Sequence, residues 1–144
     1  MTSAATVLVC ALELLGRSAD SLPRITLVDV RPPSASIYAE AFVDPATRTI
    51  YILTTSEVFR ALQRSPTRCG YLQGVRKLAS IIVHEEWHVL NGADEAGAYA
   101  AQLIALTMFG AVDTPLYNGV RRARDAAVAG QQRAARVTTI ARRE

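Results

Sequence analysis

The sequence predicts an α+β fold in which helices surround a small sheet. Three observations support this prediction: an apolar helical segment opens the chain, three short runs rich in β-branched and aromatic residues follow it, and helical periodicity dominates the rest. The chain has 144 residues, of which 50% are hydrophobic and 20% charged, as is usual for one globular domain with one core.

The first segment, residues 4–15, is apolar on all sides and is followed by Gly16, so we expect a helix that backs the sheet. Runs with strand character cover residues 24–30, 36–44 and 48–54 and are bounded by prolines and turn residues. The turn sequence "DPAT" joins the last two runs and predicts an antiparallel hairpin. We therefore expect about three strands in a mostly antiparallel sheet.

Three helical segments follow the strands. The first, "TTSEVFRALQR", has capping residues in front of Glu57 and an apolar stripe behind it. The second has apolar residues at helical spacing over residues 75–90 and ends at the Asn-Gly pair that follows. The third opens with Asp94 as its N-cap and closes at Gly110.

The sequence suggests a main domain at residues 1–117 and a basic C-terminal helix or tail at residues 118–144, packed on that domain or extending from it. Seven of the 16 basic residues follow Tyr117, against two acidic ones, Asp125 and Glu144. Clustered arginines attract phosphates. No aromatic residue lies between these arginines to stack on bases, so we do not expect a nucleic-acid partner.

Three features bear on the compartment. Cys10 and Cys69 are far apart and form no C-x-x-C pair, so we expect neither a disulfide framework nor a cysteine-ligated zinc site. The N-terminal segment has no basic start and is interrupted by Glu13, unlike a signal peptide. No apolar run approaches the roughly 18 residues that span a bilayer. These features predict a soluble, cytoplasmic protein with no membrane partner.

Both histidines of the chain, His84 and His88, lie in one segment, and Glu85 follows the first of them. Residues four apart on a helix share one face, so the two imidazoles can bind the same cation. Glu85 is turned by about 100° from His84 and can instead reach a water molecule held by that cation. This is the H-E-x-x-H arrangement, which places two metal ligands and a general base on one turn of helix.

A zinc site that performs chemistry usually has three protein ligands and one open position. The chain has no third histidine and no cysteine near the motif, so the third ligand must be a carboxylate. Asp94 and Glu95 are the candidates. We favour Glu95, which has the longer reach, although an acidic residue there also suits the helix dipole. Asp94 is the better N-cap.

The motif "HEEWH", followed by a helix with "DEAGAYAAQL", resembles the gluzincin branch of zinc metallopeptidases, in particular its minimal, single-domain members. The resemblance implies a zincin-like fold with a backing helix, a small sheet whose edge strand binds extended peptide, an active-site helix and a glutamate helix. It implies a Zn²⁺ cofactor bound by His84, His88 and Glu95. Glu85 would be the general base that activates a zinc-bound water, and a peptide or protein would be the substrate.

The chain also departs from the gluzincin pattern. The interval from His88 to Glu95 is short, and Tyr99 stands where many members have an acidic residue that orients a zinc-bound imidazole. A tyrosine there can donate a hydrogen bond to a reaction oxyanion, as a catalytic residue, or can simply pack as an aromatic side chain. "HEEWHVLNGAD" also resembles the metzincin pattern, in which Asp94 would be the third ligand.

Two further expectations concern the motif. We expect Glu86 to face solvent and Trp87 to pack in the interior. The alternative to an active peptidase is a catalytically inactive or structural-zinc protein with a zincin fold that binds or regulates a partner.

Overall fold

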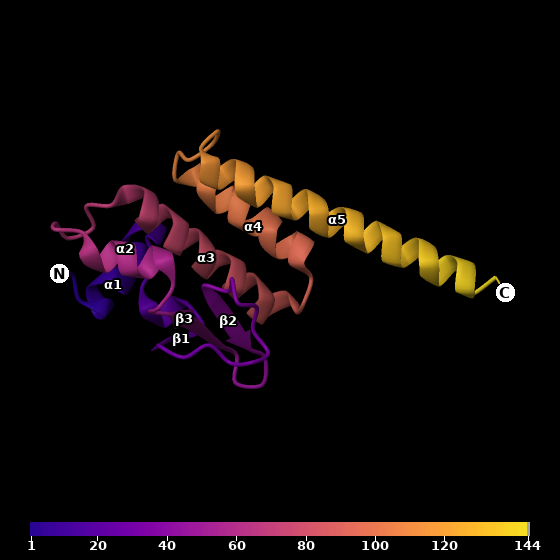
Figure 1. Ribbon diagram of the computed structural model, residues 1–144, viewed down its shortest axis with the longest axis horizontal. Helices are drawn as coiled ribbons and strands as arrows, with labels where there is room; N and C mark the ends of the chain where they lie inside the picture. The colour runs from indigo at the N-terminus through magenta and orange to yellow at the C-terminus, as the bar shows by residue number, and fades with distance from the viewer. Residues whose placement is uncertain (144) are drawn as a thin grey trace.

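The computed structural model describes residues 1–143, except for the side chain of Ala19 (Figure 1). Over these residues the fold is α+β, as the sequence predicts. The strands are β1 (Arg24–Val28), β2 (Ala41–Asp44) and β3 (Thr49–Leu53), and a short 3-10 turn, η1 (Ala19–Ser21), precedes β1. The helices are α1 (Ala4–Leu15), α2 (Glu57–Arg64), α3 (Leu72–Asn91), α4 (Glu95–Met108) and α5 (Pro115–Ala141).

The sheet is mixed, with β3 in the centre. β2 and β3 form the predicted antiparallel hairpin, but β1 runs parallel to β3, so the expectation of a mostly antiparallel sheet is wrong. The long connection over residues 29–40 allows β2 to skip one position, and β3 then fills the gap beside β1. The expected second strand is also shorter than predicted, since Ile37 and Tyr38 are exposed and lie in turns before it.

The helix α1 has the predicted bounds, with Ser3 as N-cap and Gly16 in the left-handed conformation after its end. Its main contacts are with α3 and α2, so it supports the sheet through a shared core instead of backing it alone. This core joins buried side chains from one face of the sheet and three helices, including Val7, Ile50, Ile52, Phe59, Leu78 and Ile82.

An ion pair joins the end of α1 to α3. Both Nη atoms of Arg17 donate to the carboxylate of Glu86, at 2.6 and 2.7 Å. The side chain of Glu86 is only 14% exposed, so the expectation that it faces solvent is wrong. The left-handed residue Gly16 turns the chain at the end of α1, and the following arginine reaches α3. The carboxylate raises the pKa of Arg17 through this hydrogen bond, although partial burial opposes the shift.

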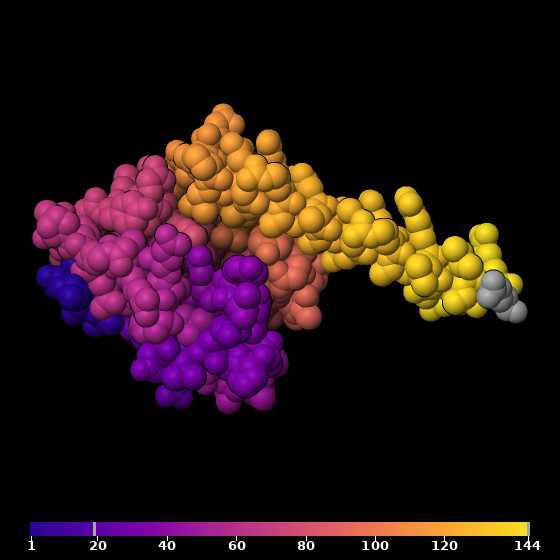
Figure 2. Space-filling view, in the orientation of Figure 1, coloured from indigo at the N-terminus to yellow at the C-terminus, as the bar shows by residue number. Residues whose placement is uncertain are grey.

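The helix α5 begins at Pro115, with Thr114 as its N-cap, and therefore starts within the expected main domain. Its first turns pack on α4, where Val120 is buried. Its later turns extend away from the body of the molecule (Figures 1 and 2). The helix thus both packs on the domain and projects from it. Glu144, the last residue of the expected C-terminal segment, lies outside the described residues. None of the described helices combines the length and apolar character needed to cross a bilayer.

Cys10 and Cys69 form a disulfide, so the expectation of no disulfide framework is wrong. The bond connects α1 to the loop between α2 and α3, and the two residues are 59 positions apart in the chain. Spacing alone could not reveal this pair because only the packing of α1 on the other helices brings the cysteines together. The expectation of a cytoplasmic protein loses one of its supports, since disulfides persist in oxidising compartments.

We predict that reduction of this disulfide destabilises the fold. Opening a cross-link of this length should lower the free energy of unfolding by about 2–4 kcal/mol. Denaturant unfolding with and without reductant measures the effect, and the Cys10→Ser/Cys69→Ser double variant is the control that reductant should not change. If the unfolding midpoint of the natural chain is the same with and without reductant, the prediction is wrong.

Candidate metal centre

The two histidines lie on successive turns of α3, at the end nearest α4. His84 is only 8% exposed, because the adjoining surface of α3 is covered by α4. The Nε2 atoms of His84 and His88 are 3.2 Å apart, so the rings converge on one point as the sequence predicts.

Glu95, in the first turn of α4, completes the cluster. Its Oε1 lies 2.7 Å from Nε2 of His88, and its Oε2 lies 3.5 Å from Nε2 of His84. One ligand atom from each of the three residues lies within 4.8 Å of the other two. Asp94 instead caps α4 by accepting from the backbone N–H of Ala96 at 3.1 Å, and it also accepts from the amide of Gln131. The structure therefore brings Glu95, and not Asp94, to the histidines.

Two glycines allow α4 to return so closely to α3. Gly92 has φ of 92°, a value that L side chains rarely adopt, and it reverses the chain directly after α3 ends at Asn91. Gly97 faces Trp87, and an added Cβ there would lie 2.3 Å from Cζ2 of the indole. Trp87 thus packs in the interface between α3 and α4, as expected, and the absence of a side chain at Gly97 leaves room for its indole ring.

The hydrogen bonds at Nδ1 favour the tautomer of each histidine that has no proton on Nε2. Nδ1 of His88 lies 2.7 Å from the carbonyl oxygen of Gly92, which only accepts, so the ring donates there. Nδ1 of His84 lies 3.0 Å from Oε1 of Gln102. In the neutral rings both Nε2 atoms then keep their lone pairs and face each other and the carboxylate of Glu95. Three acceptor atoms that converge in this way form a donor set that could hold a metal ion, and imidazole and carboxylate are ligands that zinc accepts.

Sequence reasoning missed Gln102, although a signal for it existed. It lies seven residues after Glu95, which on a helix places both on the same face two turns apart. A glutamine has many other uses on a helix, so this spacing alone carried no prediction.

Glu85 lies beside the cluster but is not one of its three converging ligands. Burial raises the pKa of its carboxyl to about 7, with His88 opposing the shift and Glu95 adding to it. Burial has the opposite effect on the base His84, whose pKa it lowers against the attraction of Glu95. The structure therefore holds Glu85 apart from the ligands, in a setting that favours proton exchange near neutral pH.

The cluster lies in a cleft of about 870 Å³. α3 forms its floor with His84 and Glu85, the edge strand β2 and the loop at residues 35–40 form one wall, and α4 with the first turns of α5 forms the other. Figure 2 shows the hollow between the strand region and α5. An ion pair of 2.9 Å between Lys77 and Glu40 ties the loop to α3 at this wall.

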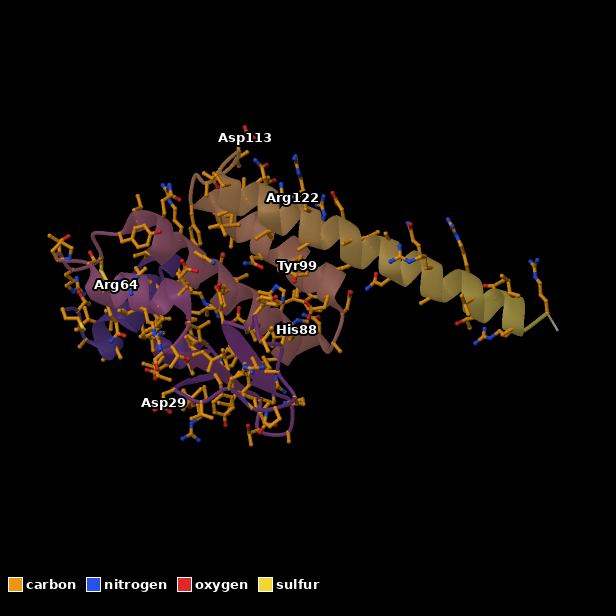
Figure 3. All side chains as sticks on the ribbon, in the orientation of Figure 1. Asp29, Arg64, His88, Tyr99, Asp113 and Arg122 are labelled. Carbon is orange, nitrogen blue, oxygen red and sulfur yellow. A yellow bond between two sulfur atoms is a disulfide. The ribbon has the colours of Figure 1, made fainter. Side chains whose placement is uncertain are left out.

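Tyr99 projects from α4 toward the same cleft, near His88 in the view of Figure 3. Its ring meets the ring of His84 edge-on, with centroids 4.7 Å apart. Partial burial raises the pKa of its hydroxyl, and the carboxylates of Glu95 and Glu85 add to the shift. The tyrosine thus packs on a candidate ligand while its hydroxyl stays protonated at neutral pH.

Comparison of the chain with protein-family models, curated proteins and solved structures finds no match.

We predict that the cluster binds one zinc ion and that Glu95 is its third ligand. Glu95→Gln should weaken zinc binding by more than the roughly 10- to 100-fold typical of groups that only support a ligand. Asp94→Asn, the matched control, keeps an N-cap and should bind zinc nearly as the natural chain does. Competition with a chromogenic chelator measures both affinities. Loss of binding in Asp94→Asn with retention in Glu95→Gln would reverse the assignment.

We also predict a pH dependence of stability for the metal-free protein. The pKa of Glu85 is raised on folding from its ordinary 4.5 to about 7, so the folded state binds this proton more tightly. The free energy of unfolding should therefore fall as the pH rises between these values, by at most about 3 kcal/mol, and then level off. The difference between the natural chain and Glu85→Gln isolates this group. A difference that is constant with pH would show that Glu85 is not buried as a carboxyl.

Proposed function

We propose that this chain is a zinc-dependent metallopeptidase that hydrolyses peptide bonds. The observation that carries the proposal is the convergence of His84, His88 and Glu95 at one point of an open cleft, with the separate carboxyl of Glu85 beside them. This combination supplies three ligands and one proton acceptor, which is the set that metal-assisted hydrolysis requires.

The openness of the site favours catalysis over a purely structural ion. The side chain of Glu95 is 52% exposed, and the cluster borders the cleft instead of being enclosed by protein. Structural zinc sites are usually closed by four protein ligands, whereas the described residues bring three to this point. The inactive or structural-zinc alternative has no comparable observation in its favour.

The residues around the cluster have distinct parts in the proposed reaction. Zinc held here would activate a water molecule and polarise the substrate carbonyl. Glu85, with a pKa near 7 in the metal-free fold, takes the proton of the attacking water and delivers it to the leaving amine. Tyr99 has a protonated hydroxyl at the cleft and donates a hydrogen bond to the oxygen on which negative charge develops.

The cleft also suits an extended peptide. β2 is an edge strand, whose outer backbone groups can pair with an added strand of substrate. Apolar residues line both sides, with Ala41 and Val43 on the strand and Leu116 and Val120 on α5. We therefore expect apolar substrate side chains next to the cleaved bond.

Two features bear on the compartment of the proposed enzyme, and they oppose each other. The cytoplasmic location expected from the sequence stays a prediction. The disulfide between Cys10 and Cys69 favours an oxidising compartment instead.

We predict that Glu85→Gln lowers kcat for an apolar peptide substrate by about 10²- to 10⁴-fold, because the water loses its proton acceptor. Zinc affinity should change little, since Glu85 is not one of the converging ligands. Glu86→Gln is the matched control. The carboxylate of Glu86, next to Glu85 in the sequence, pairs with Arg17 away from the cleft, so this variant should retain activity.

Cleavage of a quenched fluorescent peptide by the zinc-loaded proteins gives kcat, and metal analysis of the same samples gives occupancy. Equal activity in Glu85→Gln and the natural chain would refute the role of Glu85. A fully loaded natural chain that cleaves no peptide from a diverse library would refute peptidase activity itself.

A further inference from the structure

The buried side-chain amide of Gln102 links the candidate ligand His84 to Ser80 and the backbone of α3. Gln102, on α4, is 6% exposed, and its Oε1 lies 3.0 Å from Nδ1 of His84. Its Nε2 donates to the hydroxyl of Ser80 at 3.1 Å. Ser80 is fully buried, and its hydroxyl donates in turn to the carbonyl oxygen of Lys77 at 2.8 Å. These bonds form one chain from the backbone of α3 to the imidazole.

The bonds of this chain form one consistent set of directions. In it the hydroxyl of Ser80 gives its single proton to the carbonyl oxygen of Lys77, which can only accept. The oxygen of Ser80 must then accept, which requires the NH₂ group of Gln102 on that side. The amide oxygen of Gln102 consequently faces His84 and accepts the proton of its Nδ1. A neutral His84 is thereby left with its lone pair on Nε2, the atom that faces Glu95 and His88.

We propose that Gln102, oriented by Ser80, is a positioning residue that holds His84 in the tautomer able to bind the metal through Nε2. The inference rests on the metal site of the proposed function but not on its catalysis. Because Gln102 lies two turns after Glu95, the helix α4 supplies both the third ligand and the support of the first. Reversal of the amide would place its NH₂ against a ring nitrogen and stabilise the wrong tautomer, and Ser80 prevents this.

This support differs from that of His88. Nδ1 of His88 donates to the backbone carbonyl of Gly92, which no side-chain substitution removes directly. The tautomer of His84 depends instead on one side chain, so it can be tested by mutation while His88 serves as an internal reference in the same molecule. The chain has only two histidines, which makes their ring signals simple to assign.

The experiment compares Gln102→Met with Leu103→Met, a control on the same helix that is equally buried and carries no polar group. Two-bond ¹⁵N–¹H spectra of the metal-free proteins, recorded at about pH 8 where histidine is neutral, report the tautomer of each ring. We expect His84 of the natural chain and of Leu103→Met to be protonated on Nδ1 alone. Gln102→Met should show a mixture at His84 and no change at His88.

Zinc affinity is the second measurement. Gln102→Met should bind zinc about 10- to 100-fold more weakly than the natural chain, as expected when a group that supports a ligand is lost. Ser80→Ala, which leaves the amide free to reverse, should shift both measurements in the same direction by a smaller amount. It also serves as the test if Gln102→Met fails to fold.

The inference is overturned if Gln102→Met and Ser80→Ala keep the natural tautomer of His84, or if their zinc affinities match that of Leu103→Met. Neither measurement requires peptide cleavage. A protein that shows the expected shifts but no peptidase activity would refute the proposed function alone, whereas an active peptidase without these shifts would refute only the role of Gln102.

Discussion

Three lone pairs meet where α3 turns into α4, and the rest of the structure keeps them together. The Nε2 atoms of His84 and His88 are 3.2 Å apart, and the carboxylate of Glu95 reaches both of them at the edge of the cleft. The fold holds the three groups there through the reversal at Gly92 and the close contact of Trp87 with α4. Their convergence forms a donor set that could hold a metal ion, and the proposed function rests on it.

The parts of this site that the sequence could predict are those set by local geometry. The spacing of His84 and His88 is a property of any α-helix, so their convergence needed only that α3 be helical. The N-cap role of Asp94 is equally local, and it left Glu95 as the carboxylate free to turn toward the histidines. The hairpin of β2 and β3 was predictable for the same reason, because the turn lies between directly adjacent strands.

The parts that the sequence could not predict all depend on contacts between distant segments. The parallel pairing of β1 with β3, the disulfide between Cys10 and Cys69 and the ion pair of Arg17 with Glu86 each join elements whose order in space no periodicity reveals. Glu86 is an example, because its position in the motif led us to expect that it faces solvent. Its partner, Arg17, lies 69 residues earlier in the chain, and the ion pair holds the end of α1 against α3.

Burial against the apolar interior affects His84 and Glu85 in opposite ways. Removal of water disfavours charge on any group, so the burial that lowers the pKa of His84 is the same burial that raises the pKa of Glu85. A neutral imidazole is a better metal ligand than a protonated one, and a carboxylate with a higher pKa is a better proton acceptor than an ordinary one. Burial of this part of α3 therefore suits both the ligand role proposed for His84 and the base role proposed for Glu85, and α4, which carries Glu95 and Gln102, is the element that covers it.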